Sequence, residues 1–187
     1  MVATARITGG EFTGRVVHAT GALPQGFRPT SGRLREALFN ILGPSVEDAR
    51  VLDLFAGCGL IGFEALSRGA SIATFVESSR SLAEMITKTA REFGIGDRVT
   101  VVHSSLPGAL GKLRGQFDLV YIDPPYALPD VESTLATLFP LLAPGGRVVY
   151  EHSSRYNPPQ RPPGLELEQR RIYGDSAIAL YCGSESE

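Results

Sequence analysis

The stretch Val51-Leu52-Asp53-Leu54-Phe55-Ala56-Gly57-Cys58-Gly59 decides the fold. Its first five residues are mostly apolar and predict a buried strand, and its glycines predict a tight turn after that strand. The next residues, 60–67, predict a helix. A strand, a glycine turn and a helix in this order are typical of a parallel sheet whose backbone approaches a bound ligand at the turn.

The same alternation continues along the chain, which predicts an α/β fold with a parallel sheet covered on both faces. Its final two strands, joined by a Gly-Asp-Ser turn, predict a hairpin, and two short strands near the N-terminus predict another. The predicted strands are 4–8, 14–18, 51–55, 71–76, 98–102, 117–122, 147–151, 165–173 and 177–182, and the predicted helices are 31–42, 60–67, 79–93, 106–113 and 131–142.

Size and composition indicate one globular domain. The chain has 187 residues, of which 43% are hydrophobic and 20% are charged, which is ordinary for a water-soluble protein. No apolar run is long enough to span a membrane and the start lacks a signal peptide, so we expect a cytoplasmic protein. Its two cysteines, Cys58 and Cys182, are far apart and have no metal-ligand spacing, so neither a disulfide scaffold nor a metal site is expected.

The N-terminal segment is locally basic although the whole chain has a formal charge of −2. Residues 1–43 contain five arginines and two glutamates. Arginine suits planar, bidentate contact with phosphate, so this segment is a candidate phosphate-binding surface, although a charge-balanced solvated surface is the alternative. The candidate phosphate contacts are Arg6, Arg15, Arg28, Arg33 and Arg35, with Thr30 beside them.

Polar groups follow four of the predicted parallel strands, where ligands bind in such sheets. They are the glycine turn with Asp53, then Glu77, then His103-Ser104-Ser105, and then Asp123-Pro124-Pro125-Tyr126. A carboxylate at the position of Glu77 reaches a ribose diol in this fold, although it could instead serve the N-terminus of the next helix. The chain lacks a Gly-Lys-Ser/Thr sequence after the glycines, which argues against a nucleoside triphosphate.

The Asp123-Pro124-Pro125-Tyr126 turn suits a group-transfer site that holds an exocyclic amine. The Asp123 carboxylate and the Pro124 carbonyl are acceptors, two prolines stiffen the turn, and the Tyr126 ring can stack on a base or attract a cation. A rigid strand-to-helix turn is the structural alternative. Together with the other strand ends, the turn describes S-adenosylmethionine placed against a nucleobase.

Several motifs together resemble the RsmD family over nearly the whole chain. They are Arg6-Ile7-Thr8-Gly9-Gly10, Arg28-Pro29-Thr30, Arg35-Glu36-Ala37-Leu38-Phe39-Asn40, Asp53-Leu54-Phe55-Ala56-Gly57, Glu64-Ala65-Leu66-Ser67-Arg68-Gly69-Ala70, Asp123-Pro124-Pro125-Tyr126 and Tyr173-Gly174-Asp175. The resemblance implies a class I, Rossmann-like methyltransferase with a seven-stranded, mostly parallel sheet. It also implies N2-methylation of a specific guanine in 16S rRNA, alone or within the small ribosomal subunit or a late assembly intermediate, by a monomeric enzyme.

The resemblance also assigns roles to residues and segments. Residues 1–27 would form an RNA-binding β-hairpin extension, and residues 28–187 the methyltransferase domain. Catalysis would involve Asp123, Pro124, Pro125 and Tyr126, which hold the guanine. Family members often carry Asp or Asn near Ser105, so here we expect a backbone contact near Ser105 or Leu106 to hold adenine. S-adenosylmethionine, which leaves as S-adenosylhomocysteine, would bind at Asp53, Phe55, Ala56, Gly57, Gly59, Glu77, Ser78, Ser105, Leu106 and Asp123.

Three other readings remain. A DNA adenine-N6 methyltransferase would use the same acceptor turn, but the chain has no room for a second, target-reading domain. A nucleotide-binding regulator without catalysis would not need that turn. An NAD-dependent dehydrogenase also leaves the turn unexplained. Arg28 and Thr30 could contact the methionine carboxylate of the cofactor instead of RNA.

Overall fold

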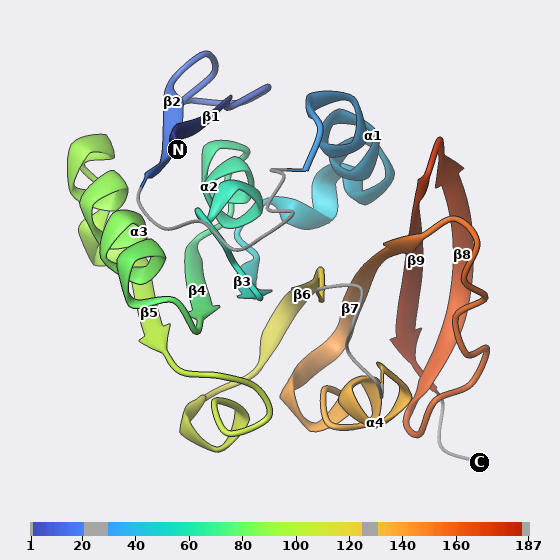
Figure 1. The fold of residues 1–187 in the computed structure, drawn as a ribbon. Helices are drawn as coiled ribbons and strands as arrows, with labels where there is room; N and C mark the ends of the chain where they lie inside the picture. The colour runs from blue at the N-terminus through green and yellow to red at the C-terminus, as the bar shows by residue number, and fades with distance from the viewer. Residues whose placement is uncertain (1, 21–29, 125–130, 185–187) are drawn as a thin grey trace.

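The structure is a computed structural model that describes residues 2–20, 30–124 and 131–184. A seven-stranded sheet forms its centre, in the order β5-β4-β3-β6-β7-β9-β8 (Figure 1). Strands β3 to β7 are parallel, and β9 and β8 are antiparallel to their neighbours. This confirms the predicted class of fold. The strands are β3 (Arg50–Leu54), β4 (Ile72–Glu77), β5 (Val99–His103), β6 (Phe117–Ile122), β7 (Leu142–Ser153), β8 (Leu165–Tyr173) and β9 (Ser176–Gly183).

Helices cover both faces of the sheet (Figure 1). Helices α1 (Gly32–Leu42), α2 (Leu60–Ser67) and α3 (Arg80–Phe93) lie on one face, and α4 (Val131–Ala136) lies on the other. The central strands are apolar on both sides because both faces are buried. Helix α1 begins where the Ser31 side chain accepts a 3.2 Å hydrogen bond from the Leu34 backbone N–H, and it ends at Gly43. No helix in the described ranges is long and apolar enough to cross a membrane.

The predicted N-terminal hairpin is present as a separate two-stranded sheet, β1 (Val2–Arg6) and β2 (Val16–Thr20). It packs on the core instead of projecting from it. Ile7 and Val17 are buried, and Phe12 lies 5.3 Å from Phe93 of α3, between ring centroids. The Phe12 N–H also donates a 2.8 Å hydrogen bond to the Ser67 hydroxyl at the end of α2. The hairpin is therefore one structural unit with the helices of this face.

A buried ion network joins the hairpin to α1 and α2. The Glu64 carboxylate on α2 is fully buried and lies 3.5 Å from Arg35 Nε of α1 and 2.9 Å from an Nη atom of Arg68. It also accepts hydrogen bonds from the Thr8 N–H at 2.9 Å and from the Thr8 hydroxyl at 2.6 Å. Removing the Glu64 carboxylate would leave the buried Arg35 without an ion-pair partner.

Two predicted helices differ from the structure. Residues 106–113 form turns and only a short 3₁₀ helix, Leu110–Lys112, because Gly108 and Gly111 lower the helical propensity. The helix predicted over 131–142 ends at Ala136, and a 3₁₀ turn, Phe139–Leu141, follows. Pro140 explains the break, because its ring would clash with the carbonyl four residues earlier. Strand β7 is longer than predicted and begins before the glycine pair that was expected to precede it.

Candidate active site

The carboxyl ends of β3, β4, β5, β6 and β7 meet at one edge of the sheet, because these five strands are parallel. This edge carries the glycine turn after β3, Glu77 at the end of β4, Asp123 after β6 and Glu151 near the end of β7. The strand order places β3 and β6 side by side at the centre. The glycine turn and the Asp123-Pro124 pair therefore follow neighbouring strands.

The glycine turn has an unusual backbone. Phe55, Gly57 and Gly59 have φ angles of 59°, 57° and 78°. Glycine adopts this left-handed region freely, but a bulky residue such as Phe55 is strained there. At Gly59 an added Cβ would also lie 3.0 Å from both the Phe63 and Phe75 rings. The turn therefore requires glycine at this position, and its strained backbone is typical of a ligand-binding loop.

Glu77 holds this turn in place. One of its carboxylate oxygens accepts a 2.7 Å hydrogen bond from the Gly57 N–H, and the other accepts a 2.6 Å bond from the Ser79 N–H. The Ser78 hydroxyl lies 3.4 Å from the same carboxylate. A carboxylate has about four acceptor positions. Glu77 therefore serves both the loop and the start of α3 and keeps capacity for a further donor.

Asp53 lies beneath the turn and is almost completely buried. Its carboxylate accepts a 3.0 Å hydrogen bond from the Gly62 N–H in the first turn of α2. Burial, with a smaller contribution from the nearby charge of Glu77, raises the pKa of Asp53 from 3.8 to about 8. A cation that binds beside this carboxyl group would stabilise its ionised form.

Asp123 follows β6 and shares this environment. Burial is the main cause that raises its pKa well above the ordinary value, and the charges of Glu151 and Asp53 add to it. No side chain or backbone N–H among the described residues donates a hydrogen bond to this carboxylate. Pro124 is buried beside it, whereas Pro125 and Tyr126 lie outside the described residues. The Asp123 carboxylate therefore accepts no hydrogen bond from the described residues and can accept one from a ligand.

Glu151 is a site residue that the sequence reasoning missed. It follows Tyr150, which pairs with Ile122, so Glu151 lies beside Asp123 on the neighbouring strand. Its carboxylate accepts hydrogen bonds from the Tyr121 hydroxyl and, at 3.4 Å, from the Thr30 hydroxyl. Burial raises the pKa of Glu151, although these hydrogen bonds oppose the shift. A carboxylate directly after a buried apolar strand, as in Asp123, is the signal that could have identified it.

Three acids with raised pKa values make this edge favourable for positive charge. Burial is the main cause for Asp53, Asp123 and Glu151, and the charges of Asp53 and Glu151 further raise the pKa of Asp123, so a bound cation would stabilise the charged forms. A cofactor with a sulfonium and an ammonium group meets this requirement, and Glu77 and the glycine turn fit its nucleoside end. The residues present therefore fit S-adenosylmethionine.

The remaining predicted cofactor residues lie at the neighbouring strand ends. Ala56 is held to β4 by a 3.0 Å hydrogen bond from its N–H to the Val76 carbonyl. The ring nitrogen Nε2 of His103 lies 3.0 Å from the Ser78 carbonyl, which ties the end of β5 to that of β4. Ser105 is exposed, and Leu106, half-buried, follows it. Both lie at the edge where adenine was expected.

The predicted RNA-binding arginines do not form one surface. Arg35 is 2% exposed and donates to the carbonyls of Thr30 and Arg6, so the prediction that it binds phosphate is wrong. The amphipathic pattern of α1 gave no sign that the Glu64 carboxylate lies against this helix. Arg28 lies outside the described residues.

Arg15 lies near the tip of the N-terminal hairpin, whereas Arg33 lies in the first turn of α1. Arg15 is 4.1 Å from the Phe93 ring centroid and donates to the Glu92 carbonyl, at the end of α3 farthest from the site. Arg6 donates to the Gly14 carbonyl near the same tip of the hairpin. Arg33 is exposed in the first turn of α1, close to Thr30 and hence to Glu151.

Comparison with known proteins agrees with this geometry. Residues 5–182 match the family described as conserved hypothetical protein 95. Ribosomal RNA small subunit methyltransferase D from Escherichia coli is 34% identical over 94% of this chain and 88% of its own length. The chain belongs to the RsmD family.

Solved structures show that this RsmD-family chain also shares its fold with known methyltransferases. The structure of yhhF from Escherichia coli has a TM-score of 0.84 and 31% identity, and the match covers 98% of this chain and all of that one. An RNA methyltransferase from Salinibacter ruber in complex with S-adenosyl-L-homocysteine shares the fold, with a TM-score of 0.64, 20% identity and coverage of 86% and 97%. The predicted methyltransferase fold is confirmed.

Proposed function

We propose that this protein transfers a methyl group from S-adenosylmethionine to the exocyclic N2 of a guanine in small-subunit ribosomal RNA. The observation that supports this most strongly is the Asp123 carboxylate. It lies beside the glycine turn, and no described residue donates a hydrogen bond to it. The 34% identical relative is named a ribosomal RNA small subunit methyltransferase, which supports the choice of RNA.

Two groups of residues would hold the cofactor. Glu77, with the backbone of Gly57 and Gly59, would hold the ribose, and the edge near Ser105 and Leu106 would hold adenine. Asp53 and Asp123 would face the positive methionine end, because burial makes them gain most from a nearby cation. When bound, S-adenosylmethionine supplies a methyl group on a positively charged sulfur, and the carbon–sulfur bond breaks as the carbon–nitrogen bond forms, leaving its electron pair on sulfur.

Asp123 and Pro124 would orient the guanine. The amino group of guanine is a weak nucleophile because its lone pair is delocalised into the ring. Hydrogen bonds from its two N–H groups to the ionised Asp123 carboxylate and to the Pro124 carbonyl would favour a pyramidal nitrogen whose lone pair is free to react. Positioning and electrostatics then supply most of the rate. The proton becomes acidic once nitrogen is alkylated and leaves to Asp123 or to water, so Asp123 need not be a strong base.

Glu151 would add negative charge beside Asp123. Hydrogen bonds from Tyr121 and Thr30 fix the Glu151 carboxylate beside Asp123. Thr30 thereby joins the segment before α1 to the edge of the sheet. We assign Thr30 to this internal contact, which serves the site indirectly.

The RNA partner belongs to the small ribosomal subunit in this proposal. A buried or paired guanine must be turned out or presented in a loop to reach Asp123. The protein would act as a monomer in the cytoplasm, on free 16S rRNA or on an assembly intermediate.

The test compares Asp123→Ala with Asp118→Asn, a change of the other acid of β6. Asp118 forms an ion pair with Arg50 at the opposite edge of the sheet, with 3.0 Å between Arg50 Nε and the carboxylate. Transfer of labelled methyl to unmethylated 16S rRNA should fall about 100-fold or more in Asp123→Ala, whereas Asp118→Asn keeps its activity. Both variants should bind S-adenosylhomocysteine within a few-fold of the original protein. Undiminished transfer by Asp123→Ala would exclude the proposed role.

A further inference from the structure

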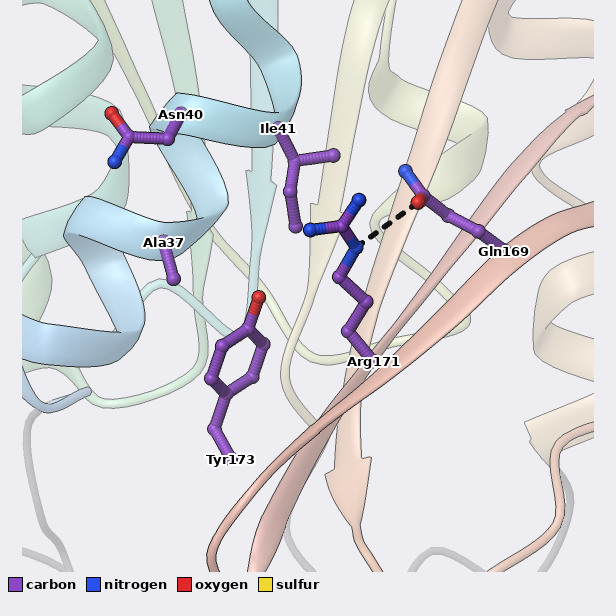
Figure 2. Close-up of a pocket in the computed structure, with 6 residues that line it drawn as sticks. All are labelled: Ala37, Asn40, Ile41, Gln169, Arg171 and Tyr173. Atoms are coloured by element: carbon purple, nitrogen blue, oxygen red, sulfur yellow. Dashed lines mark hydrogen bonds between the residues drawn. The ribbon is translucent and has the colours of Figure 1, made fainter.

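A polar hollow separates α1 from the edge strand β8, on the face that carries α1, α2 and α3. Its volume is about 390 Å³, within the range of ligand-binding pockets. Figure 2 shows the six residues that line it. They are Ala37, Asn40 and Ile41 from α1 and Gln169, Arg171 and Tyr173 from β8.

A β-bulge in β8 turns the three strand residues toward this hollow. The register with β9 shifts between Leu167, which pairs with Tyr181, and Gln169, which pairs with Leu180. Side chains alternate along a strand, so one extra residue reverses the faces of all that follow. Leu167 packs against the opposite face of the sheet, whereas Tyr173 packs against the face of α1. Without the bulge, Arg171 would point away from α1.

The lining can donate hydrogen bonds and carries positive charge. Arg171 is exposed, and its Nε donates a 3.2 Å hydrogen bond to the Gln169 side chain. No carboxylate lines the hollow, and Arg171 forms no ion pair with any described residue. Glu36 is exposed on α1 but is not part of the lining. Arg170, the neighbour of Arg171, instead donates to the carbonyls of Ser154 and Tyr156. A polyanion complements this surface.

One end of the hollow lies at the same level along the strands as the candidate active site. Tyr173 pairs with Ser176, and Ser176 pairs with Ser153, two residues beyond Glu151 on β7. On the other wall, Arg33 precedes Ala37 by four residues and Asn40 by seven, so the three lie on one stripe of α1. Arg33 is at the end of this stripe beside Thr30. The hollow therefore forms a groove along β8, from Tyr173 at the level of Ser153 to Gln169, with Ala37, Asn40 and Ile41 of α1 as its other wall.

We propose that this groove binds the sugar-phosphate backbone of a single RNA strand that flanks the target guanine. This proposal rests on the proposed function for the identity of the nucleic acid. Arg171 and Arg33 contact phosphates, and the amides of Asn40 and Gln169 with the Tyr173 hydroxyl contact phosphate or ribose oxygens. These contacts carry no base specificity, but they position the strand so that one nucleotide reaches Asp123.

Two variants test the groove in independent ways. Arg171→Gln removes the charge, and Gln169→Glu places a carboxylate beside Arg171, which neutralises it without removing it. Arg91→Gln and Gln116→Glu are the matched controls. Arg91 is exposed in the last turn of α3 and Gln116 is exposed just before β6, both at the opposite edge of the sheet.

The probe is unmethylated 16S rRNA made by transcription. Arg171→Gln and Gln169→Glu should each weaken binding about tenfold, because a charge-assisted hydrogen bond is lost. The slope of log affinity against log salt should become less steep by about 0.7 in each. The KM for RNA should rise similarly, while kcat and S-adenosylhomocysteine affinity stay unchanged. The control variants should match the original protein in every measurement.

The outcomes separate this proposal from the proposed function. Equal losses in the groove and control variants, or an unchanged salt slope in both groove variants, would overturn the groove. If the original protein binds 16S rRNA but transfers no methyl to it, the proposed function fails, and the four binding curves still decide whether the groove is used. A change confined to self-association of the variants, without a loss of RNA binding, would also overturn the proposal by indicating a second copy as the occupant.

Discussion

Glu64→Gln is expected to destabilise the protein strongly, because the Glu64 carboxylate neutralises two arginines inside it. Its side chain is 0% exposed, and those of its ion-pair partners Arg35 and Arg68 are 3% and 22% exposed. A glutamine keeps one acceptor oxygen for Thr8 but turns an amide N–H₂ toward groups that donate. Breaking a buried ion pair costs about 3–5 kcal/mol. With about 2.1 cal/mol/K of unfolding entropy per residue, this corresponds to a decrease in Tm of about 8–13 °C.

Glu84→Gln is the matched control for this change. Glu84 also pairs with an arginine four positions away, Arg80, at 2.9 Å, but the two side chains are 66% and 81% exposed. An exposed pair of this kind contributes about 0.3–0.5 kcal/mol, so the control should lower Tm by about 1 °C. Both variants are measured by urea and thermal unfolding in the same buffer. Equal losses in the two variants would refute the reasoning that burial gives the Glu64 network its importance.

Three further predictions concern the candidate site. Because burial raises the pKa of Asp53 to about 8, its stabilising contribution is full below about pH 4 and is lost as the pH rises toward 8. A bound cation favours the ionised form of Asp53, so calorimetry should show that the affinity for S-adenosylmethionine increases from pH 6 to 8. The increase should be steeper than for S-adenosylhomocysteine, whose sulfur is uncharged. The same pH dependence for both ligands would contradict this. Tyr121→Phe should cost about 1–3 kcal/mol in urea unfolding because buried Glu151 loses a donor, and a loss no larger than that of exposed Tyr156→Phe would count against it. Gly62→Ala places a Cβ 2.3 Å from the Phe75 ring and should cost about 1–3 kcal/mol, whereas Gly96→Ala, with open space around it, should be neutral; similar unfolding curves for the two would disprove the packing argument.

The order of strands and helices could be predicted from the sequence because each element has its own period and its own stop signal. Helix α2 and strand β6 begin and end where the pattern predicts. The predictions failed where Pro140 interrupts one apolar pattern and where Gly108 and Gly111 weaken another. The bulge in β8 was also invisible, because no glycine marks it and only the register with β9 reveals the extra residue.

The site residues at the ends of strands could be predicted from the sequence. The site residues that depend on contacts between distant segments could not. Asp53, Glu77 and Asp123 lie in or just after the carboxyl ends of apolar strands, and parallel topology brings these ends together. Glu151 was not predicted, because its hydrogen-bond partners, Tyr121 and Thr30, are 30 and 121 residues away along the chain. Arg35 was misplaced for the same reason, since the acid that buries it lies on another helix.

The most direct test of the central claim is nucleoside mass spectrometry on 16S rRNA from a bacterial strain that lacks its own RsmD-family enzyme, with and without this protein. The account predicts that one guanosine becomes N2-methylated when the original protein is present and that the Asp123→Ala variant leaves it unmodified. A methyl group found on adenine N6 in DNA, or on another atom of the RNA, would contradict the account.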